Sequence, residues 1–201
     1  MRNVGIVVFD DAEELDFVGP WEVLAYAAKL TGRDRLLLVG ERLRPIRCAK
    51  GMQVVPDILF SDTPPLDVLL VPGGKGARRD PPDAVLIEWL RSAGASARWV
   101  TSVCTGALLL YEAGLARGRR VTTHFRHIEK LRARGDVTVL DRVRYVQDGN
   151  LVTAAGVSAG IDMALWLVGQ RDGIATARQV QREIQYEPAP PYVDADVEAT
   201  Q

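Results

Sequence analysis

The sequence predicts an α/β protein: a single-domain, three-layer sandwich in which helices cover both faces of a mostly parallel central sheet. Continuous apolar runs at residues 4–9 and 67–71 are typical of strands that are buried on both faces of such a sheet. Segments with helical spacing of apolar residues alternate with these runs, and no linker or repeat interrupts them. The 201 residues, 47% hydrophobic and 25% charged, suit one domain with a large core.

The elements follow in order along the chain. Strands are expected at residues 4–9, 35–39, 67–71, 98–103 and 137–140, and a hairpin at 143–147 and 151–154 around the turn 148–150. Helices are expected at residues 20–30, 81–90, 105–113, 128–131, 158–167 and 174–184, and proline suits the first turn of the first two. We assign residues 1–192 to the domain and residues 193–201 to a loose tail.

The composition indicates which classes of partner and which cellular compartment to expect. A formal charge of −1 gives no electrostatic reason to expect binding to nucleic acid or to an anionic membrane. The N-terminus does not resemble a signal peptide, and no apolar stretch is long enough to cross a bilayer. Cys48 and Cys104 form neither a disulfide framework nor a metal-binding spacing. We therefore expect a cytoplasmic protein.

Cys104 is the strongest candidate for chemistry. It stands where the apolar run 98–103 ends and the helical segment 105–113 begins. A sharp strand-to-helix turn lifts such a residue above the sheet, as in a nucleophile elbow. Free N–H groups and the positive end of the helix dipole meet it there, and both favour a lowered thiol pKa. We expect a thiolate nucleophile at this position.

A thiolate nucleophile also needs a place for developing negative charge. The candidate oxyanion donors are the N–H of Thr105, next to the cysteine, and that of Gly74, after the strand 67–71. The pair Gly73-Gly74 lets the backbone approach a substrate closely, since neither residue has a side chain. The alternative is that these glycines only turn the chain.

Asp16 is the candidate proton carrier. It belongs to the loop 10–20, which holds five carboxylates, most of them expected to be solvated. Leu15 and Phe17 flank Asp16, and burial between them would raise its pKa by desolvation. The alternative role is an N-terminal cap for the following helix.

Two further residue types are less distinctive. His124 and His127 are three residues apart, but a metal site would need additional ligands that the sequence does not offer. His124 could reach the Cys104 neighbourhood, although a hydrogen-bonded structural role is the simpler interpretation. Cys48 lies in a polar stretch, and we treat it as incidental.

These motifs together resemble the ThiJ/PfpI superfamily, whose fold is similar to class I glutamine amidotransferase domains. The resemblance spans residues 3–192. It rests on GIVVF (5–9), LDFVGP (15–20), VPGG (71–74), SVCTG (102–106), EAGLA (112–116), VTTH (121–124), DGNLVT (148–153) and GVSAGID (156–162).

Within that superfamily the chain resembles the bacterial isocyanide hydratases. Thr105 follows the cysteine, where PfpI-type peptidases carry histidine, and Asp16 stands where the Parkinsonism-associated branch carries glutamate. The segment QYEPAPPY (185–192) also resembles the hydratases, whereas AAGVS (154–158) departs from them. AraC-type regulators share the Cys-Thr-Gly motif, but we expect no DNA-binding module after Tyr192.

The resemblance implies a hydro-lyase that converts an isocyanide and water into an N-substituted formamide. Cys104 would attack the terminal carbon and Asp16 would transfer the proton. Thr105 would orient Asp16 or water, while the amides of Gly74 and Thr105 line the pocket. The resemblance also implies a homodimer that acts on a small molecule without a metal or organic cofactor. Two alternatives remain: a glyoxalase III or deglycase acting on reactive aldehydes, and a cysteine redox sensor without turnover.

Overall fold

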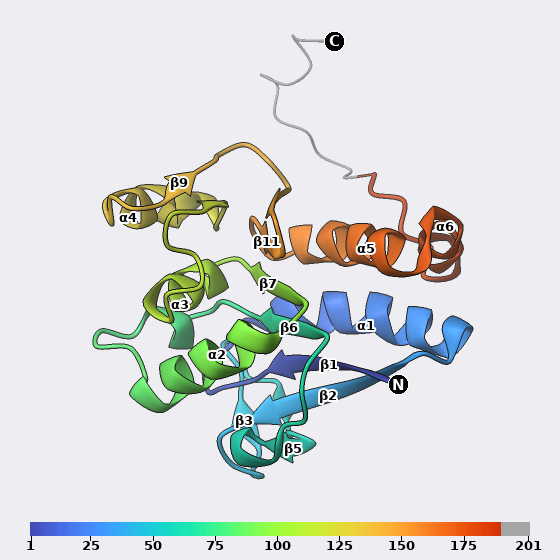
Figure 1. Cartoon of the computed structure of the whole chain (residues 1–201), viewed down its shortest axis with the longest axis horizontal. Helices are drawn as coiled ribbons and strands as arrows, with labels where there is room; N and C mark the ends of the chain where they lie inside the picture. Colours follow the sequence, from blue (N-terminus) through green and yellow to red (C-terminus); the bar gives the residue numbers. More distant parts are fainter. Residues whose placement is uncertain (190–201) are drawn as a thin grey trace, which may run out of the picture.

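A seven-stranded sheet runs through the middle of the protein, whose computed structural model describes residues 1–189 (Figure 1). Its strand order is β10-β11-β7-β6-β1-β2-β5, and only the β10–β11 pair is antiparallel. The strands are β1 (Arg2–Val7), β2 (Asp34–Gly40), β5 (Ile58–Leu59), β6 (Val68–Val71), β7 (Trp99–Val103), β10 (Tyr145–Asp148) and β11 (Leu151–Ala154). The predicted α/β class with a mostly parallel sheet is confirmed.

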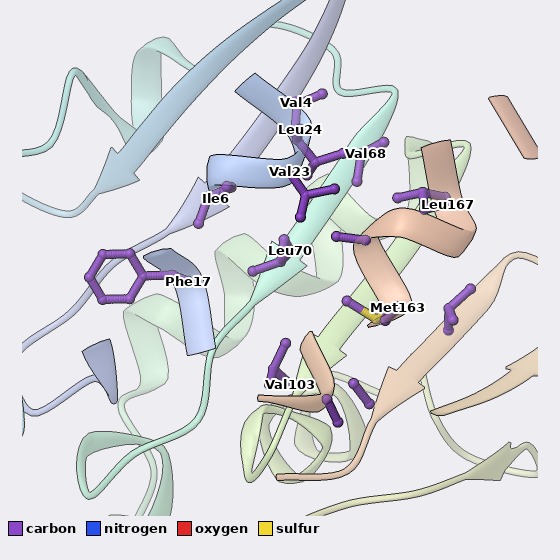
Figure 2. Packing of buried hydrophobic residues seen from close by; sticks show 14 of the residues in the cluster. Val4, Ile6, Phe17, Val23, Leu24, Val68, Leu70, Val103, Met163 and Leu167 are labelled. Carbon is purple, nitrogen blue, oxygen red and sulfur yellow. The ribbon is translucent and has the colours of Figure 1, made fainter. Parts of the chain in front are cut away.

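Helices cover both faces of this sheet, because alternate residues of each strand point to opposite sides. Val68 and Leu70 of β6 pack in one apolar cluster with α1, α5 and α6, while Leu69 and Val71 pack in another with α2, α3 and α4. Figure 2 shows the first cluster, in which Val23 and Leu24 of α1 lie near Val68 of β6. The helices are α1 (Glu14–Thr31), α2 (Ala84–Ser96), α3 (Gly106–Glu112), α4 (Ile128–Arg132), α5 (Ala159–Asp172) and α6 (Ile174–Glu183).

The first helix begins earlier than the sequence predicted. Helix α1 starts at Glu14, and Pro20 lies inside it, buried, not at its first turn. The acidic side chains of Glu14 and Asp16 suit the first turn, because a helix N-terminus favours negative charge. Residues 14–20 of the expected acidic loop are therefore helical.

The second helix also begins differently. Prolines 81 and 82 precede α2 but do not open it, since the N-terminal cap is Asp83. Its carboxylate accepts hydrogen bonds from the N–H groups of Val85 and Leu86 at 3.0 and 3.2 Å.

Several short elements lie outside the main sheet. The expected strand 137–140 shortens to β9 (Thr138–Val139), which pairs in parallel with β8 (Arg120–Val121) in a separate two-stranded sheet. A second small pair, β3 (Ile46–Arg47) and β4 (Gln53–Val54), was not predicted. The predicted domain end at 192 and the tail 193–201 fall outside the described residues. Across residues 1–189, no helix is long and apolar enough to cross a membrane.

Candidate active site

The candidate residues gather at the carboxyl ends of β1, β6 and β7. Neighbouring strands β1 and β6 continue into helices on opposite faces, since α1 packs in one apolar cluster and α2 in the other. Such a divergence opens a crevice above the strand ends, where α/β proteins place their ligand sites. Asp16 follows β1, Gly73 follows β6 and Cys104 follows β7.

Cys104 occupies a tight turn between β7 and α3. Its φ of 56° lies in the left-handed region, which costs a non-glycine residue roughly 1–3 kcal/mol. Its N–H donates to the carbonyls of Ala154 and Ala155 at 3.1 and 2.7 Å, and its own carbonyl accepts a 2.8 Å bond from the Thr123 hydroxyl. These bonds offset the strain. The predicted strand–turn–helix geometry is present, and the nucleophilic role of the thiol stays a prediction.

The thiol pKa differs from expectation. The helix start was expected to lower it, but the pKa of Cys104 is raised to about 11. Burial is the main cause, because only 6% of the residue is exposed, and the charge of Asp16 adds to it. The backbone N–H groups of Thr105 and Val157 and the hydroxyl of Thr105 offset part of the rise.

Asp16 lies in the first turn of α1 and is fully buried. Its Oδ2 accepts a 2.8 Å hydrogen bond from the N–H of Gly73, while its Oδ1 has no partner within residues 1–189. The alternative role as N-terminal cap is wrong, because Glu13 holds the cap position. Burial raises the pKa of Asp16 to about 7, partly offset by the Gly73 N–H and by the Cys104 thiol. The predicted rise is confirmed.

The two groups therefore affect one another's protonation. Each is buried, and a charge on Asp16 raises the pKa of Cys104. The state with both groups ionised is strongly disfavoured, and the remaining proton lies mainly on the thiol because the pKa of Cys104 exceeds that of Asp16. A thiolate becomes accessible when that proton resides on Asp16.

Thr105 and the two glycines hold this pair in place. The Thr105 hydroxyl accepts a 3.0 Å bond from the N–H of Gly74 and contacts the Gly74 carbonyl at 3.3 Å. The Gly74 N–H is thus engaged by Thr105, and its role as an oxyanion donor stays a prediction. A Cβ on Gly73 would lie 2.5 Å from the Thr105 nitrogen and 2.9 Å from Asp16 Oδ2. Gly73 therefore does more than turn the chain: its lack of a side chain lets these groups meet.

Val157 is a site residue that the sequence analysis missed. Val157 lies in the loop between β11 and α5. Its N–H forms a hydrogen bond with the Cys104 thiol, which lowers the pKa of that thiol. Its φ of 38° is rare for a β-branched residue. The one available signal was the segment 154–158, which departs from the hydratases that the chain otherwise resembles.

Comparison with known proteins identifies the family. The DJ-1/PfpI family matches residues 2–170, most of the chain. The chain belongs to the DJ-1/PfpI family. It is 42% identical over 190 residues to the isonitrile hydratase of Pseudomonas putida, covering 94% of this chain and 81% of that protein.

Other family members broaden the range of activities. The glutathione-independent glyoxalase DJR-1.2 of Caenorhabditis elegans is 28% identical, with 82% of this chain and 85% of that protein covered. A crystal structure of a THiJ/PfpI family protein from Pseudomonas syringae superimposes with a TM-score of 0.87 at 30% identity, covering 98% of this chain and 80% of that one. The family thus includes both hydratase and glyoxalase names.

His124 lies at the edge of the site in this family member. Its Nδ1 accepts a 3.2 Å bond from the N–H of Arg126, and a Cβ on Gly156 would lie 3.0 Å from its ring. The ring therefore borders the loop that carries Val157, and in the described structure it makes no hydrogen bond to Cys104. Burial and the charges of Arg126 and Arg78 lower the pKa of His124, which keeps it neutral at physiological pH.

The remaining candidates for chemistry are less favourably placed. Cys48 is buried, and burial together with Glu14 and Asp10 raises its thiol pKa to about 11. Within the described part of the chain, no three His, Cys, Asp or Glu side chains gather in a way that could hold a metal ion.

Proposed function

We propose that this protein is an isocyanide hydratase, which converts an isocyanide and water into an N-substituted formamide. The observation that carries the proposal is the buried pair of Asp16 and Cys104, in which the carboxyl has a pKa of about 7 and one unpartnered oxygen. The 42% identity to an isonitrile hydratase across nearly the whole chain supports it. The family relation alone would also fit an aldehyde substrate.

In the first step, the sulfur of Cys104 attacks the electrophilic terminal carbon of the isocyanide. The thiol proton first moves to Asp16, which leaves the sulfur as thiolate. As the S–C bond forms, Asp16 delivers this proton to the same carbon. The product is a thioimidate in which the nitrogen keeps its substituent and the carbon carries hydrogen and sulfur. Asp16 is left ionised, and its raised pKa suits the transfer.

In the second step, the Asp16 carboxylate takes a proton from water as the water oxygen adds to the thioimidate carbon. Asp16 passes this proton to the nitrogen, which gives a tetrahedral adduct with one hydroxyl group. As the C–S bond breaks, the hydroxyl proton moves to Asp16, the formamide is released and the sulfur leaves as thiolate. Asp16 again holds the proton, which restores the state that attacks the isocyanide. The Thr105 hydroxyl keeps the Gly73-Gly74 turn in position beneath Asp16 throughout.

The decisive experiment measures formamide release from purified protein across a panel of alkyl and aryl isocyanides. We expect turnover by the wild type and a loss on the order of 10³-fold or more for Cys104→Ala. Cys48→Ala is the matched control and should retain activity, because that thiol lies outside the site. Absence of turnover on every isocyanide tested would overturn the proposal.

The glyoxalase alternative uses the same thiol, so methylglyoxal is measured side by side. A hydratase should be far slower on methylglyoxal than on its isocyanide, and the reverse ranking would favour the aldehyde activity. The redox-sensor alternative is tested by mass spectrometry after mild peroxide treatment, because a stable sulfinate on Cys104 in a protein without turnover would favour the sensor. A homodimer and a cytoplasmic location remain expectations that come from the family resemblance and the composition.

A further inference from the structure

Arg144 contacts both ends of the loop that lies over Cys104. Its carbonyl accepts a 2.9 Å hydrogen bond from the N–H of Ala155, which begins the loop. Its guanidinium lies 3.3 Å from the hydroxyl of Ser158, which ends the loop, and its Nε donates to Asp162 Oδ2 at 2.6 Å. Arg144 thus connects the two ends of the loop 155–158 on the side that faces away from Cys104.

The inner side of the same loop contacts the cysteine. The Ala155 carbonyl accepts a 2.7 Å hydrogen bond from the N–H of Cys104, and the N–H of Val157 forms a hydrogen bond with the thiol. Val157 has a φ of 38°, so the loop holds a conformation that a β-branched residue rarely adopts by itself. External contacts are needed to keep this conformation.

Ser158 provides an independent indication. A serine at the N-terminal cap of a helix normally accepts a hydrogen bond from its own helix. At the start of α5 it makes no such bond within the described structure, and its hydroxyl faces the Arg144 guanidinium instead. The serine is thus used to attach the loop to Arg144.

The attachment extends to the C-terminal segment. Asp162 Oδ1 accepts a 2.9 Å bond from the hydroxyl of Tyr186, while its Oδ2 accepts from Arg144. Tyr186 belongs to the segment 185–192, which the sequence analysis singled out without assigning it a role. The chain Tyr186–Asp162–Arg144–Ser158 therefore links that segment to the loop beside the thiol.

We propose that Arg144 is a positioning residue that holds the Val157 N–H against the sulfur of Cys104, with Asp162 and Tyr186 orienting its guanidinium. The effect of Arg144 on catalysis rests on the proposed function, but its effect on the thiol does not. Without Arg144 the loop relaxes and the sulfur loses an N–H contact. The thiolate of Cys104 then becomes harder to form.

The test is the pH dependence of Cys104 alkylation by iodoacetamide, followed at that residue by peptide mass spectrometry so that Cys48 does not contribute. We expect Arg144→Ala to slow alkylation about three- to tenfold near neutral pH and to shift the profile upward. Arg144→Lys, which keeps the charge but not the planar fork, should fall between. Arg91→Ala, which removes an exposed arginine paired with Glu88, is the matched control and should match wild type.

Ser158→Ala removes only the hydroxyl that faces the guanidinium, so it tests the proposal even if Arg144→Ala fails to fold. Its effect should have the same sign, and the double variant should add little to Arg144→Ala. A wild-type alkylation profile in folded Arg144→Ala, or in Ser158→Ala where the former does not fold, overturns the proposal. If alkylation shifts as expected but no isocyanide is turned over, positioning stands and the hydratase assignment fails.

Discussion

Within residues 1–189, fully buried carboxylates lie at both ends of the sheet, but only those at the amino ends of the strands pair with arginines. At the amino ends of the strands, the side chains of Asp34 and Asp172 are fully buried, and Arg2 contacts them at 2.6 and 2.8 Å. Arg171, whose side chain is 2% exposed, contacts Asp34 at 2.9 Å. At the carboxyl ends, Asp16 is equally buried but receives one backbone N–H.

The difference separates stability from reactivity. A buried carboxylate with arginine partners stays ionised and holds elements together, and losing a partner is costly. A buried carboxylate without a cation titrates near neutral pH, so it can give and take a proton at little cost. In the described residues, the amino ends of the strands tie β1 and β2 to α5, and the opposite ends keep a proton available beside Cys104.

The comparison is tested first at Asp16. Asp16→Asn keeps the shape and an acceptor for the Gly73 N–H but cannot transfer a proton. We expect kcat on an isocyanide to fall by about 10²–10⁴-fold, the range of general acid–base catalysis. The measurement is formamide release at saturating substrate. A loss under about fivefold would remove Asp16 from the proposed mechanism.

The same variant should be more stable than the wild type at alkaline pH. Because the pKa of Asp16 is raised in the folded state, its contribution to stability is fully present below about pH 4 and is lost as pH rises to about 7. Asp16→Asn has no such charge, so above pH 7.5 its free energy of unfolding should exceed that of wild type by a few kcal/mol at most. Urea unfolding at pH 5 and pH 8 measures this, and equal gains at both pH values would contradict it.

Replacing Arg171 should have the opposite effect to Asp16→Asn, with a loss of stability and little change in activity. Arg171→Ala leaves Asp34 with one arginine and removes the contact with Asp67, so we expect a loss of about 3 kcal/mol in the free energy of unfolding. Activity per folded molecule should stay within about twofold of wild type, because the network lies at the far end of the sheet. Urea unfolding and active-site titration measure the two quantities. A large drop in kcat would show that the two ends are coupled.

Two buried threonines sharpen the contrast within one region. Thr105→Val removes the hydroxyl that holds Gly74, while Thr101→Val removes a hydroxyl that donates to the Leu69 carbonyl inside the sheet at 3.0 Å. Each should lose about 1–3 kcal/mol of stability. Thr105→Val should also lose about tenfold in kcat, because the turn beneath Asp16 loosens. Equal kcat values for the two variants would assign Thr105 a structural role only.

The sequence allowed the fold and the residues of the central pair to be predicted, because both depend on local patterns. Apolar runs located the strands, and the breaks after residues 71 and 103 placed Gly73 and Cys104 at strand ends. Asp16 could be selected among five carboxylates by its apolar neighbours.

What could not be predicted depends on long-range packing. The thiol pKa was expected to fall because the helix start was visible in the sequence, while the burial and the neighbouring Asp16 were not. The engaged N–H of Gly74 depends on the Thr105 rotamer, and the φ of Val157 on a loop attached from outside. The start of α1 was misplaced because proline was taken as a first-turn marker, although it is accommodated here within the helix.

The smallest expected effect is at His124, the other titratable side chain near the loop. His124→Asn keeps an acceptor for the N–H of Arg126, since asparagine caps a helical turn well, and removes the ring. Because the pKa of His124 is lowered, its charge changes below the pH range in which Asp16 titrates. We therefore expect kcat to fall less than about threefold. The plot of kcat against pH should keep the inflection near pH 7 that titration of Asp16 predicts. A loss of that inflection in His124→Asn, but not in Asp16→Asn, would transfer the proton-carrying role from the carboxyl to the imidazole.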